Sequence, residues 1–553
     1  MKQNIVNKLN KIIKKYLESY GLVDESKLSI KIPPKNIDAD FATNIAMLIA
    51  KKNGEDYIIV AKKISNDIIK KNPNFIEKAE VLPPGFINLH IKKEIFYKEI
   101  FKILKEKNKY GKLYKKHNEK IIFEFVSANP TGPLHIGHGR GAVIGDSLSR
   151  ILSYLGHNVT KEYYLNNVGN QILNLAESTK NCYKQLVIND KLNFSKNEYK
   201  GNYIVDIAKR LIEKYKNITE IDFQKETVKE ILKMIKNDLK SLDVKFDNWF
   251  FETKLAINKD INGKTEVDKI CEYLISKNYA YIKNGALWLA SSKFGDDKDR
   301  VIRRSNGRYT YFASDIAYHK NKFERKFTKL INLWGADHHG YIKRIKACIQ
   351  MLGFNQEALK IIIYQFVSVV RDGGVSVAMS TRTGEFITLK SILDEVGKDT
   401  CRFLFLLNTA NSQLEFNVDL AKKQSIKNPV FYIQYVNARC NSIIKKCKNK
   451  KNITTNIKNI NFNLLNTNEE KKLIKHLTEF CNILSLSEKT MSPHYLATYL
   501  VELADKYHTF YEKCQVLSDN LDLTSARLKL VESVIIIIQN GLKLLGISCP
   551  NKM

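Results

Sequence analysis

Residues 121–156 carry the pattern that decides the fold of this chain. They begin with a nearly continuous apolar, β-prone run, Ile121-Ile122-Phe123-Glu124-Phe125-Val126, and continue into a loop, Ser127-Ala128-Asn129-Pro130-Thr131-Gly132-Pro133-Leu134-His135-Ile136-Gly137-His138-Gly139-Arg140-Gly141. A helical pattern follows, with Ile144, Leu148, Ile151, Leu152 and Leu155 on one face, and it ends at Gly156. Residues 159–165 then read as a second strand. Strand, loop, helix and strand form the unit from which parallel sheets are built.

The rest of the chain extends this pattern on both sides. Apolar runs at 329–334 and 361–370, each followed by a glycine-containing loop, fit the same sheet, and the charged helical stretch at 170–260 reads as an insertion. We therefore expect a doubly wound, Rossmann-like parallel-sheet domain over residues 109–408.

The two ends of the chain have other patterns. Helical periodicity at 41–53 and 58–71, followed by a short alternating strand at 86–90, predicts an α/β module over residues 1–108. Beyond residue 409 the patterns are almost entirely helical, so residues 409–553 are expected to form an all-α bundle. The lysine-rich stretches 101–120 and 445–463 read as linkers or loops. The expected fold class is multidomain α/β.

The charge of the chain is unusual for its length. It has 553 residues with 90 Lys+Arg against 58 Asp+Glu, a formal net charge of +32. A polyanionic partner such as nucleic acid would explain this excess, and so would the lysine-rich codon usage of an AT-rich genome. Composition alone leaves both explanations open.

Several classes of protein are not expected. The longest conspicuous apolar run, 534–538, is far shorter than the ~20 residues that span a bilayer. The basic, amphipathic first 21 residues read as an ordinary helix rather than a transit peptide. The nine cysteines are dispersed without a Cys-x-x-Cys pair, which argues against a disulfide framework and a thiolate zinc site. We expect a cytoplasmic protein with no structural metal and no membrane partner.

The loop after the first sheet strand is the strongest chemical signal. The position between a strand and its helix is where α/β sheets bind nucleotides, and the helix N-terminus favours phosphate. His135 and His138 are three residues apart at the start of that helix, so both imidazoles can donate to phosphoryl oxygens. The spacing of Gly137, Gly139 and Gly141 does not fit the dinucleotide-binding fingerprint, and no Walker sequence is present.

These residues carry a resemblance to a known family. The tetrad His135-Ile136-Gly137-His138 resembles the signature of class I aminoacyl-tRNA synthetases, and residues 123–138 as a whole resemble the arginyl branch of that class. Further matches in the same order lie at 41–46, 311–319, 334–340, 428–435 and 546–550. The resemblance therefore runs through the whole chain.

The resemblance implies an arginine–tRNA ligase. Such an enzyme activates L-arginine with ATP to arginyl-adenylate, releases pyrophosphate, and transfers arginine to the 3′-terminal adenosine of tRNA(Arg). It implies ATP with accompanying Mg²⁺, and we expect a monomer. The catalytic residues carried over are His135, His138 and Arg382, and the ATP-binding residues are Pro130, Gly132, His135, Gly137, His138, Gly335, Asp337, His338, Met379 and Ser380.

The second signature of the class is altered here. The matching stretch is Ala378-Met379-Ser380-Thr381-Arg382, in which Ala378 and Thr381 stand where the family has two lysines. Arg382 is the first candidate for the replacing cation and Arg371 the second. A plain surface hairpin is the alternative.

The resemblance also assigns the amino-acid site. Its arginine-binding residues are Glu124, Ser127, Asn129, Tyr311, Asp315 and His339. A guanidinium group has five donors, which carboxylates and tyrosine match well. Glu124 could instead pair with a lysine and Tyr311 could belong to the core. Asp337 suits a ribose, and a zinc site at Asp337-His338-His339 is the less favoured alternative.

The helical C-terminal part resembles an anticodon-binding domain. Its candidate tRNA contacts are Tyr432, Gln434, Tyr435, Asn437 and Arg439, because aromatic, amide and guanidinium groups can stack on or bond to unstacked bases. The N-terminal module resembles an addition that touches the outer corner of tRNA. Three alternatives stay open: a synthetase for another amino acid, a non-enzymatic RNA-binding protein, and a stand-alone nucleotidylyltransferase.

Overall fold

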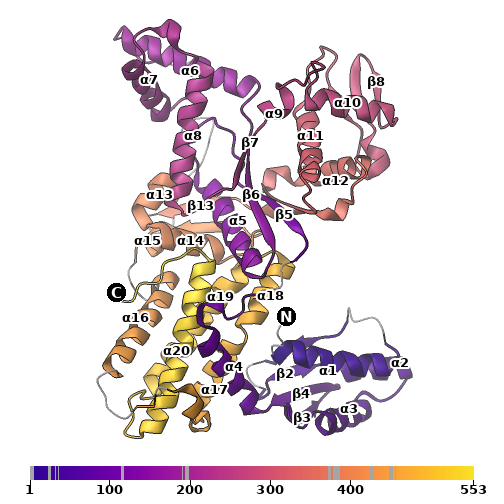
Figure 1. Cartoon of the computed structure of the whole chain (residues 1–553), viewed down its shortest axis with the longest axis vertical. Helices are drawn as coiled ribbons and strands as arrows, with labels where there is room; N and C mark the ends of the chain where they lie inside the picture. The colour runs from indigo at the N-terminus through magenta and orange to yellow at the C-terminus, as the bar shows by residue number, and fades with distance from the viewer. Residues whose placement is uncertain are drawn as a thin grey trace.

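The computed structural model has three parts that follow one another along the chain (Figure 1). A small α/β module comes first, a domain around a five-stranded sheet follows, and long helices close the chain. The structure describes all residues except 1–4, 23–26, 32, 35–36, 114–116, 190, 194–197, 372–374, 378–386, 424, 426, 448–452 and 455. The expected multidomain α/β class is confirmed.

The N-terminal module packs helices on an antiparallel sheet of order β1-β2-β4-β3. Its elements are α1 (Ile5–Ser19), β1 (Ile30–Lys31), β2 (Phe41–Thr43), α2 (Ile45–Asn53), α3 (Tyr57–Lys71), β3 (Ile76–Leu82) and β4 (Phe86–Ile91). The prediction of a helix over 41–53 was wrong at its start. Phe41 and Thr43 both point into the core, as on a strand, and the helix begins only at Ile45.

The central sheet is entirely parallel and has the order β12-β11-β5-β6-β7. Its strands are β5 (Lys120–Glu124), β6 (Asn158–Leu165), β7 (Asn248–Phe251), β11 (Lys329–Gly335) and β12 (Leu359–Tyr364). The chain moves outward from β5 to β6 and β7, and then returns to β11 on the other side of β5. The strand order therefore reverses between β5 and β11, which is where sheets of this kind bind ligands.

Helices cover both faces of this sheet. Phe123 and Phe125 pack in the same core as α5 (Ile136–Tyr154), whereas Ile122 packs in a second core with α10 (Glu266–Ser276), α11 (Tyr311–Glu324) and α12 (Ile342–Met351). Successive side chains of a strand point to opposite faces, so an apolar strand such as β5 needs a helical layer on each side. The doubly wound arrangement is confirmed.

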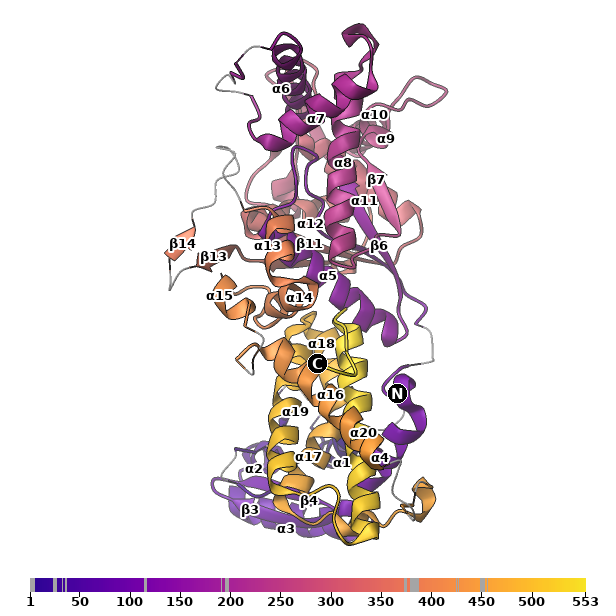
Figure 2. The same ribbon diagram turned by 90° about the vertical axis from the view of Figure 1, so that its left-hand side faces the viewer.

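The helical insertion is shorter than predicted. It comprises α6 (Asn170–Val187), α7 (Asn202–Lys214) and α8 (Phe223–Ser241), and it rises from the sheet in Figure 2. The prediction extended it to residue 260, but Asn248–Phe251 is the edge strand β7 of the main sheet. This strand has only four residues, too few to show the alternation of apolar and polar side chains that would reveal a strand in the sequence.

A second excursion leaves the sheet after β7 and was not predicted. It contains α9 (Thr253–Ala256), α10, and an antiparallel sheet of β8 (Ala280–Lys283), β9 (Ala286–Leu289) and β10 (Arg300–Arg303), before α11 leads back to β11.

The apolar run at 361–370 is not one strand. It divides into β12 and β13 (Val367–Arg371), and β13 pairs with β14 (Val375–Val377) and β15 (Leu414–Asn417) in a separate small sheet. The break is at Gln365. Its backbone N–H donates to the Ala410 carbonyl, and its backbone carbonyl accepts a hydrogen bond from the buried Arg140 guanidinium. A buried guanidinium thus fixes the point where the chain leaves the main sheet.

Helices dominate the chain after β14. They are α13 (Leu389–Val396), α14 (Lys398–Leu406), α15 (Val418–Ala421), α16 (Pro429–Cys447), α17 (Asn468–Thr478), α18 (Phe480–Thr490), α19 (His494–Lys513) and α20 (Leu521–Leu544). The predicted linker at 101–120 is partly wrong, because α4 (Lys93–Glu106) packs against α17 and α20. Ile100, Ile103 and Leu104 form its buried face.

A buried arginine links the sheet domain to the end of the helical part. Arg402 on α14 and Asp146 on α5 are both fully buried and lie 2.8 Å apart. The same guanidinium donates to the carbonyls of Leu242, after α8, and Leu545, after α20. Four segments distant in sequence therefore meet at one side chain.

No helix within the described ranges is long and apolar enough to cross a membrane. All nine cysteines lie in the described ranges, and none of them forms a disulfide.

The packing of β5 on α5 gives a stability prediction. A Cβ added at Gly145 would lie 2.3 Å from Cγ of the Phe125 ring. Gly145→Ala should therefore lower the free energy of unfolding by about 1–3 kcal/mol despite the better helix propensity of alanine. Urea denaturation measures this, and Gly340→Ala is the control because nothing lies within 4 Å of its added Cβ. Equal stability of the two variants would contradict the packing argument.

Candidate active site

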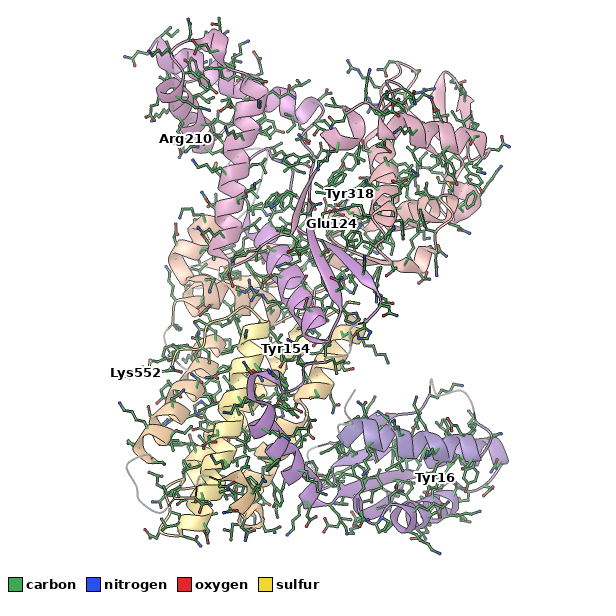
Figure 3. All side chains as sticks on the ribbon, in the orientation of Figure 1. Tyr16, Glu124, Tyr154, Arg210, Tyr318 and Lys552 are labelled. Carbon is green, nitrogen blue, oxygen red and sulfur yellow. The ribbon has the colours of Figure 1, made fainter. Side chains whose placement is uncertain are left out.

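A large pocket of about 1090 Å³ lies at the carboxyl ends of the central strands. The ends of β5 and β11 supply Glu124 and Gly335, and the start of α5 supplies His135 and His138. Figure 3 shows Glu124 in the middle of this region, next to Tyr318 of α11. The pocket is thus at the reversal of strand order, as expected for an open α/β sheet.

The two histidines cap the helix that they begin. The His138 amide donates to Nδ1 of His135, and the His135 amide donates to Nδ1 of His138, both at 3.3 Å. The rings stack with their centroids 3.6 Å apart. Because each Nδ1 accepts a hydrogen bond, each neutral ring carries its proton on Nε2. Two N–H donors are therefore available to a ligand at the helix N-terminus.

Both imidazoles are neutral in the empty pocket at pH 7. Burial lowers the pKa of His135 to about 4, although the nearby Asp337 carboxylate raises it slightly. Burial also holds the pKa of His138 well below its usual value, and the neighbouring His135 lowers it further. The pair can thus donate hydrogen bonds without carrying charge of its own.

The glycines of the signature have different tasks. Gly137 lines the pocket, and a Cβ there would lie 3.0 Å from Cε1 of His135, so this glycine leaves room for the imidazole. Gly139 and Gly141 do not line the pocket; added Cβ atoms would contact Leu389 and Tyr364. Gly139 and Gly141 therefore make room for packed side chains rather than for a ligand.

Three buried carboxylates gather at the other end of the pocket. Glu124 and Asp315, both predicted, are joined by Glu252, which follows β7. An oxygen of Glu252, Oε2, is buried without a hydrogen-bond partner among the described residues, and the neighbouring Tyr164 hydroxyl is in the same situation. A buried carboxylate oxygen without a hydrogen bond favours a ligand with donors, although the Tyr164 hydroxyl beside it is itself a possible donor.

The carboxylates affect one another's protonation. Burial, helped by the nearby Glu252 and Glu124 carboxylates and opposed by the hydrogen bond from Tyr341, raises the pKa of Asp315 to about 8. Burial also raises the pKa of Glu252. This end of the pocket therefore favours a cation, which would stabilise the ionised forms.

Glu124 has a partner of its own. The fully buried Lys322 ammonium lies 2.5 Å from Oε2 of Glu124 and also donates to the Asn332 side chain. The alternative that Glu124 pairs with a lysine is therefore confirmed. Glu124 nevertheless also lines the pocket. Tyr311 is 49 % exposed and lines the pocket as well, so it is not a core residue.

Sequence reasoning missed Glu252 and Tyr341. Glu252 follows the aromatic run 248–251 directly, so the rule that ligands bind at the carboxyl ends of strands would have found it once that run had been identified as a strand. Tyr341 has no such signal, because only the fold brings it 2.7 Å from Asp315.

The turn leaving β5 is held in an unusual conformation. Val126 and Ser127 have positive φ angles of 66° and 41°, which is costly for residues other than glycine. The Ser127 hydroxyl accepts from the Tyr164 amide, and the Tyr163 hydroxyl donates to the Ala128 carbonyl. The neighbouring strand β6 thereby fixes the turn that presents Ser127 to the pocket.

The remaining predicted residues of the loop divide into two groups. Asn129 lines the pocket and its side chain donates to Gln171 of the insertion. Pro130 and Gly132 do not line it; Gly132 lies against Tyr203 of α7, whose hydroxyl donates to the Thr131 carbonyl.

The segment after β11 places two of its three polar residues at the pocket. Asp337 and His338 line it, with Nε2 of His338 3.4 Å from Oδ2 of Asp337, whereas His339 is exposed and does not line it. Among the described residues, the group of at least three close potential metal ligands is His117, His157 and Glu488, away from this segment. The alternative of a zinc site at 337–339 therefore has no support.

The second signature stretch lies outside the described residues, and with it Met379, Ser380 and Arg382. Arg371, the other candidate cation, is described. It makes two hydrogen bonds of 2.7 Å to Glu395 of α13, so its guanidinium is already engaged.

The five predicted tRNA contacts on α16 separate into surface and interior residues. Tyr432 and Tyr435 stack with His508, and Arg439 lies over Tyr511, forming a half-exposed aromatic face. Gln434 and Asn437 are buried instead and bond to the C-terminal tail, through the Ser548 and Pro550 carbonyls. These two side chains hold the fold and are not available to an RNA base.

Comparisons with known proteins cover the whole chain. Family models match for "tRNA synthetases class I (R), catalytic domain" over residues 99–424, "DALR anticodon binding domain" over 433–553, and "Arginyl tRNA synthetase N terminal domain" over 3–91.

Individual proteins agree with the family matches. The chain is 40 % identical over 538 residues to an arginine–tRNA ligase of Carboxydothermus hydrogenoformans, covering 96 % of this chain and 95 % of that protein. It is 42 % identical over 535 residues to that of a Geobacter species, covering 95 % of each. In fold it is similar to arginyl-tRNA synthetase of Thermus thermophilus, with a TM-score of 0.74, 19 % identity and 99 % of each chain covered.

The state of the histidine pair can be measured directly. We expect the His135 ring in the ligand-free protein to stay neutral from pH 8 down to about pH 5, because burial lowers its pKa to about 4. Histidine-selective ¹⁵N NMR measures both the titration and the tautomer, and His135→Asn identifies the signal. A titration midpoint near 6.5, or a proton on Nδ1, would show that the capping geometry is wrong.

Proposed function

The chain belongs to the arginyl-tRNA synthetase family of class I, and we propose from its site how it selects arginine and promotes adenylation. Its activity is that of an arginine–tRNA ligase with ATP, arginine and tRNA(Arg) as substrates. The observation that carries the proposal is one pocket with buried carboxylates at one end and two neutral imidazoles at the helix N-terminus.

The carboxylate end of the pocket receives the guanidinium of the substrate. Its donors find the unpaired oxygen of Glu252, the carboxylate of Asp315 and the oxygen of Glu124 that Lys322 leaves free. A planar group with five donors suits this set of acceptors. Its positive charge stabilises the ionised forms of all three carboxylates. Tyr311 closes this end, and Ser127 and Asn129 lie where the α-amino and carboxylate groups would be oriented.

The histidine end of the pocket receives the triphosphate of ATP. In the first step, the carboxylate oxygen of arginine attacks the α-phosphorus, the bond to the pyrophosphate oxygen breaks, and pyrophosphate leaves with the electron pair. Negative charge on the phosphoryl oxygens is stabilised by the Nε2–H donors of His135 and His138 and by the N-terminus of α5. Asp337 faces the same region and suits the ribose hydroxyls. In the second step, the 2′-hydroxyl oxygen of the tRNA adenosine attacks the acyl carbonyl, the bond from the acyl carbon to the phosphate oxygen breaks, and AMP leaves with the electron pair while a phosphate oxygen takes the hydroxyl proton.

Further assignments follow from this mechanism. Mg²⁺ enters with ATP as a counter-ion of the triphosphate, and Asp337 is the exposed carboxylate at that end of the pocket. The aromatic face of Tyr432, Tyr435 and Arg439 offers stacking surfaces for anticodon bases. We assign residues 1–108, 109–408 and 409–553 to tRNA-binding, catalytic and anticodon-binding domains of a cytoplasmic monomer.

Removing one imidazole tests the histidine assignment. His135→Asn keeps a good N-cap residue and should leave the fold intact, yet it removes a donor to the phosphoryl group. The rate of ATP–pyrophosphate exchange, measured with arginine and tRNA(Arg), should fall by about 10²-fold or more. Circular dichroism and tRNA binding serve as controls for folding. An unchanged exchange rate in a folded variant would refute the assignment.

The raised pKa of Asp315 gives a pH prediction. In the empty pocket this carboxyl has a pKa of about 8, while bound guanidinium favours its ionised form, so binding releases a proton. The KM for arginine should therefore fall as pH rises from 6 to 8, by up to about tenfold per unit, and level off above 8.

The matched variants decide whether Asp315 causes that slope. Asp315→Asn should raise the KM and remove its pH dependence, and Asp419→Asn, an exposed carboxylate on α15, should change neither. Persistence of the slope in Asp315→Asn would assign the proton to another group and contradict the role given to this residue.

A further inference from the structure

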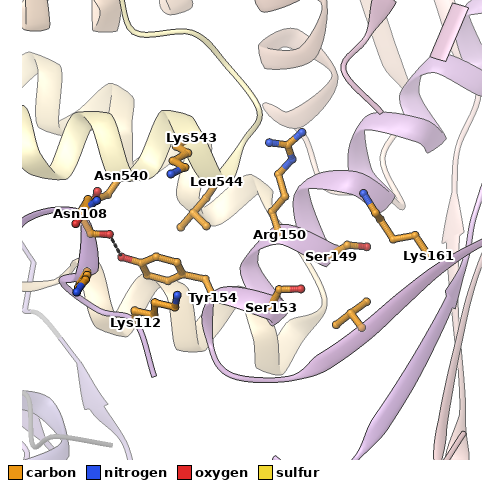
Figure 4. A pocket seen from close by; sticks show the side chains of 12 residues that line it. Asn108, Lys112, Ser149, Arg150, Ser153, Tyr154, Lys161, Asn540, Lys543 and Leu544 are labelled. Atoms are coloured by element: carbon orange, nitrogen blue, oxygen red, sulfur yellow. Dashed lines mark hydrogen bonds between the residues drawn. The ribbon is translucent and has the colours of Figure 1, made fainter. Parts of the chain in front are cut away.

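A second, strongly basic pocket lies at the other end of β6 from the catalytic pocket (Figure 4). It has a volume of about 470 Å³, within the range of small-molecule sites. Three parts of the chain form its walls: the connector after α4, the end of α5 with the start of β6, and the last turns of α20. Val159 lines this pocket and Tyr164 the catalytic one, about 17 Å apart along the strand at ~3.3 Å per residue. The substrates of the catalytic pocket therefore do not reach it.

The charge of this pocket has one sign. Of the described residues that line it, five are cationic and none is a carboxylate; the five are Lys109, Lys112, Arg150, Lys161 and Lys543. Arg150 and Lys161 are held from behind by the buried Asp146, at 2.7 and 3.3 Å, and Arg150 also by Asp243. Lys109, Lys112 and Lys543 have no ion-pair partner among the residues that the structure describes. Three ammonium groups facing one cavity repel one another unless an anion joins them.

The walls of the pocket are fixed by hydrogen bonds rather than by the lysines. The Tyr154 hydroxyl donates to the carbonyls of Asn108 and Tyr110, and the first of these bonds is drawn in Figure 4. The Asn540 side chain of α20 donates to the Lys107 carbonyl, and the Leu113 amide donates to the Tyr154 carbonyl. Connector, α5 and α20 are thereby tied together before any ligand binds, so the cavity is preformed.

We propose that this pocket is a binding site for a small anion with several phosphate groups, an inorganic oligophosphate or a nucleoside polyphosphate. Several cations around one concave site match a compact polyanion, and phosphate is the group that lysine and arginine bind most readily at such density. The apolar side chains of Val159 and Leu544 in the same lining leave room for a base. A ligand here contacts the catalytic domain and the helical domain at once, and so would stabilise their junction. The backbone of tRNA is the competing occupant, and the test separates the two.

The test uses the full-length protein saturated with arginine and a non-hydrolysable ATP analogue, which together fill the catalytic pocket including its phosphate end. Tripolyphosphate is then titrated calorimetrically, with inorganic phosphate and GTP in parallel. We expect one tripolyphosphate site per chain, with weaker binding of phosphate. Binding of GTP at least as tight as tripolyphosphate identifies a nucleotide, and weaker binding identifies the inorganic chain.

The double variant Lys112→Ala/Lys543→Ala should weaken tripolyphosphate binding by roughly a hundredfold, since each lysine supplies a charge-assisted hydrogen bond. The matched control, Lys240→Ala/Lys471→Ala, removes two exposed lysines of α8 and α17 and should bind as the unaltered protein does.

Three results would overturn the proposal: no saturable tripolyphosphate site, an equal loss in the control variant, or a raised KM for tRNA in the pocket variant with unchanged tripolyphosphate binding. The last result would assign the pocket to the tRNA backbone.

Charging of tRNA(Arg) with arginine is measured in parallel, and both double variants should keep the kcat of the unaltered protein. Failure of the unaltered protein to charge arginine would refute the proposed function, while the titration would still report on this pocket.

Discussion

The direct contact between Phe125, the residue after β5, and α5 is the constraint on which the site depends. The Phe125 ring lies against the backbone of Gly145, at a distance that leaves no room for a Cβ. This contact places the end of β5, with Glu124, and the start of α5, with His135 and His138, at a fixed separation around one pocket. In the proposed function, the two ends of this single strand–loop–helix unit hold the guanidinium of the substrate and the triphosphate of ATP.

The fold was largely predictable because its main elements have clear periods. The apolar run of β5, the amphipathic α5 and the long C-terminal helices follow directly from residue spacing. The errors have physical causes. β7 is too short to show a period, and β12 and β13 read as one run because their separation depends on the distant Arg140. Local sequence does not contain that information.

The site was predictable where a residue stands next to a recognisable strand end. Glu124, His135, His138, Asp315 and Asp337 line one pocket, as the resemblance implied for their neighbourhood. Residues on α16 show the limit of this reasoning. Tyr432 and Asn437 have similar sequence surroundings, yet one lies on an aromatic face and the other bonds to the C-terminal tail. Only tertiary packing distinguishes them. Part of the basic excess gathers in one pocket that shares no lining residue with the pocket of Glu124 and His135.

In the proposed function, buried carboxylates select a cationic side chain. Comparing arginine with citrulline, its uncharged isostere, in ATP–pyrophosphate exchange with tRNA(Arg) tests this most directly. Citrulline would leave Glu252 and Asp315 buried without a counter-charge, so the account predicts that kcat/KM for arginine exceeds that for citrulline by about 10⁴-fold or more. A ratio near one would contradict the account.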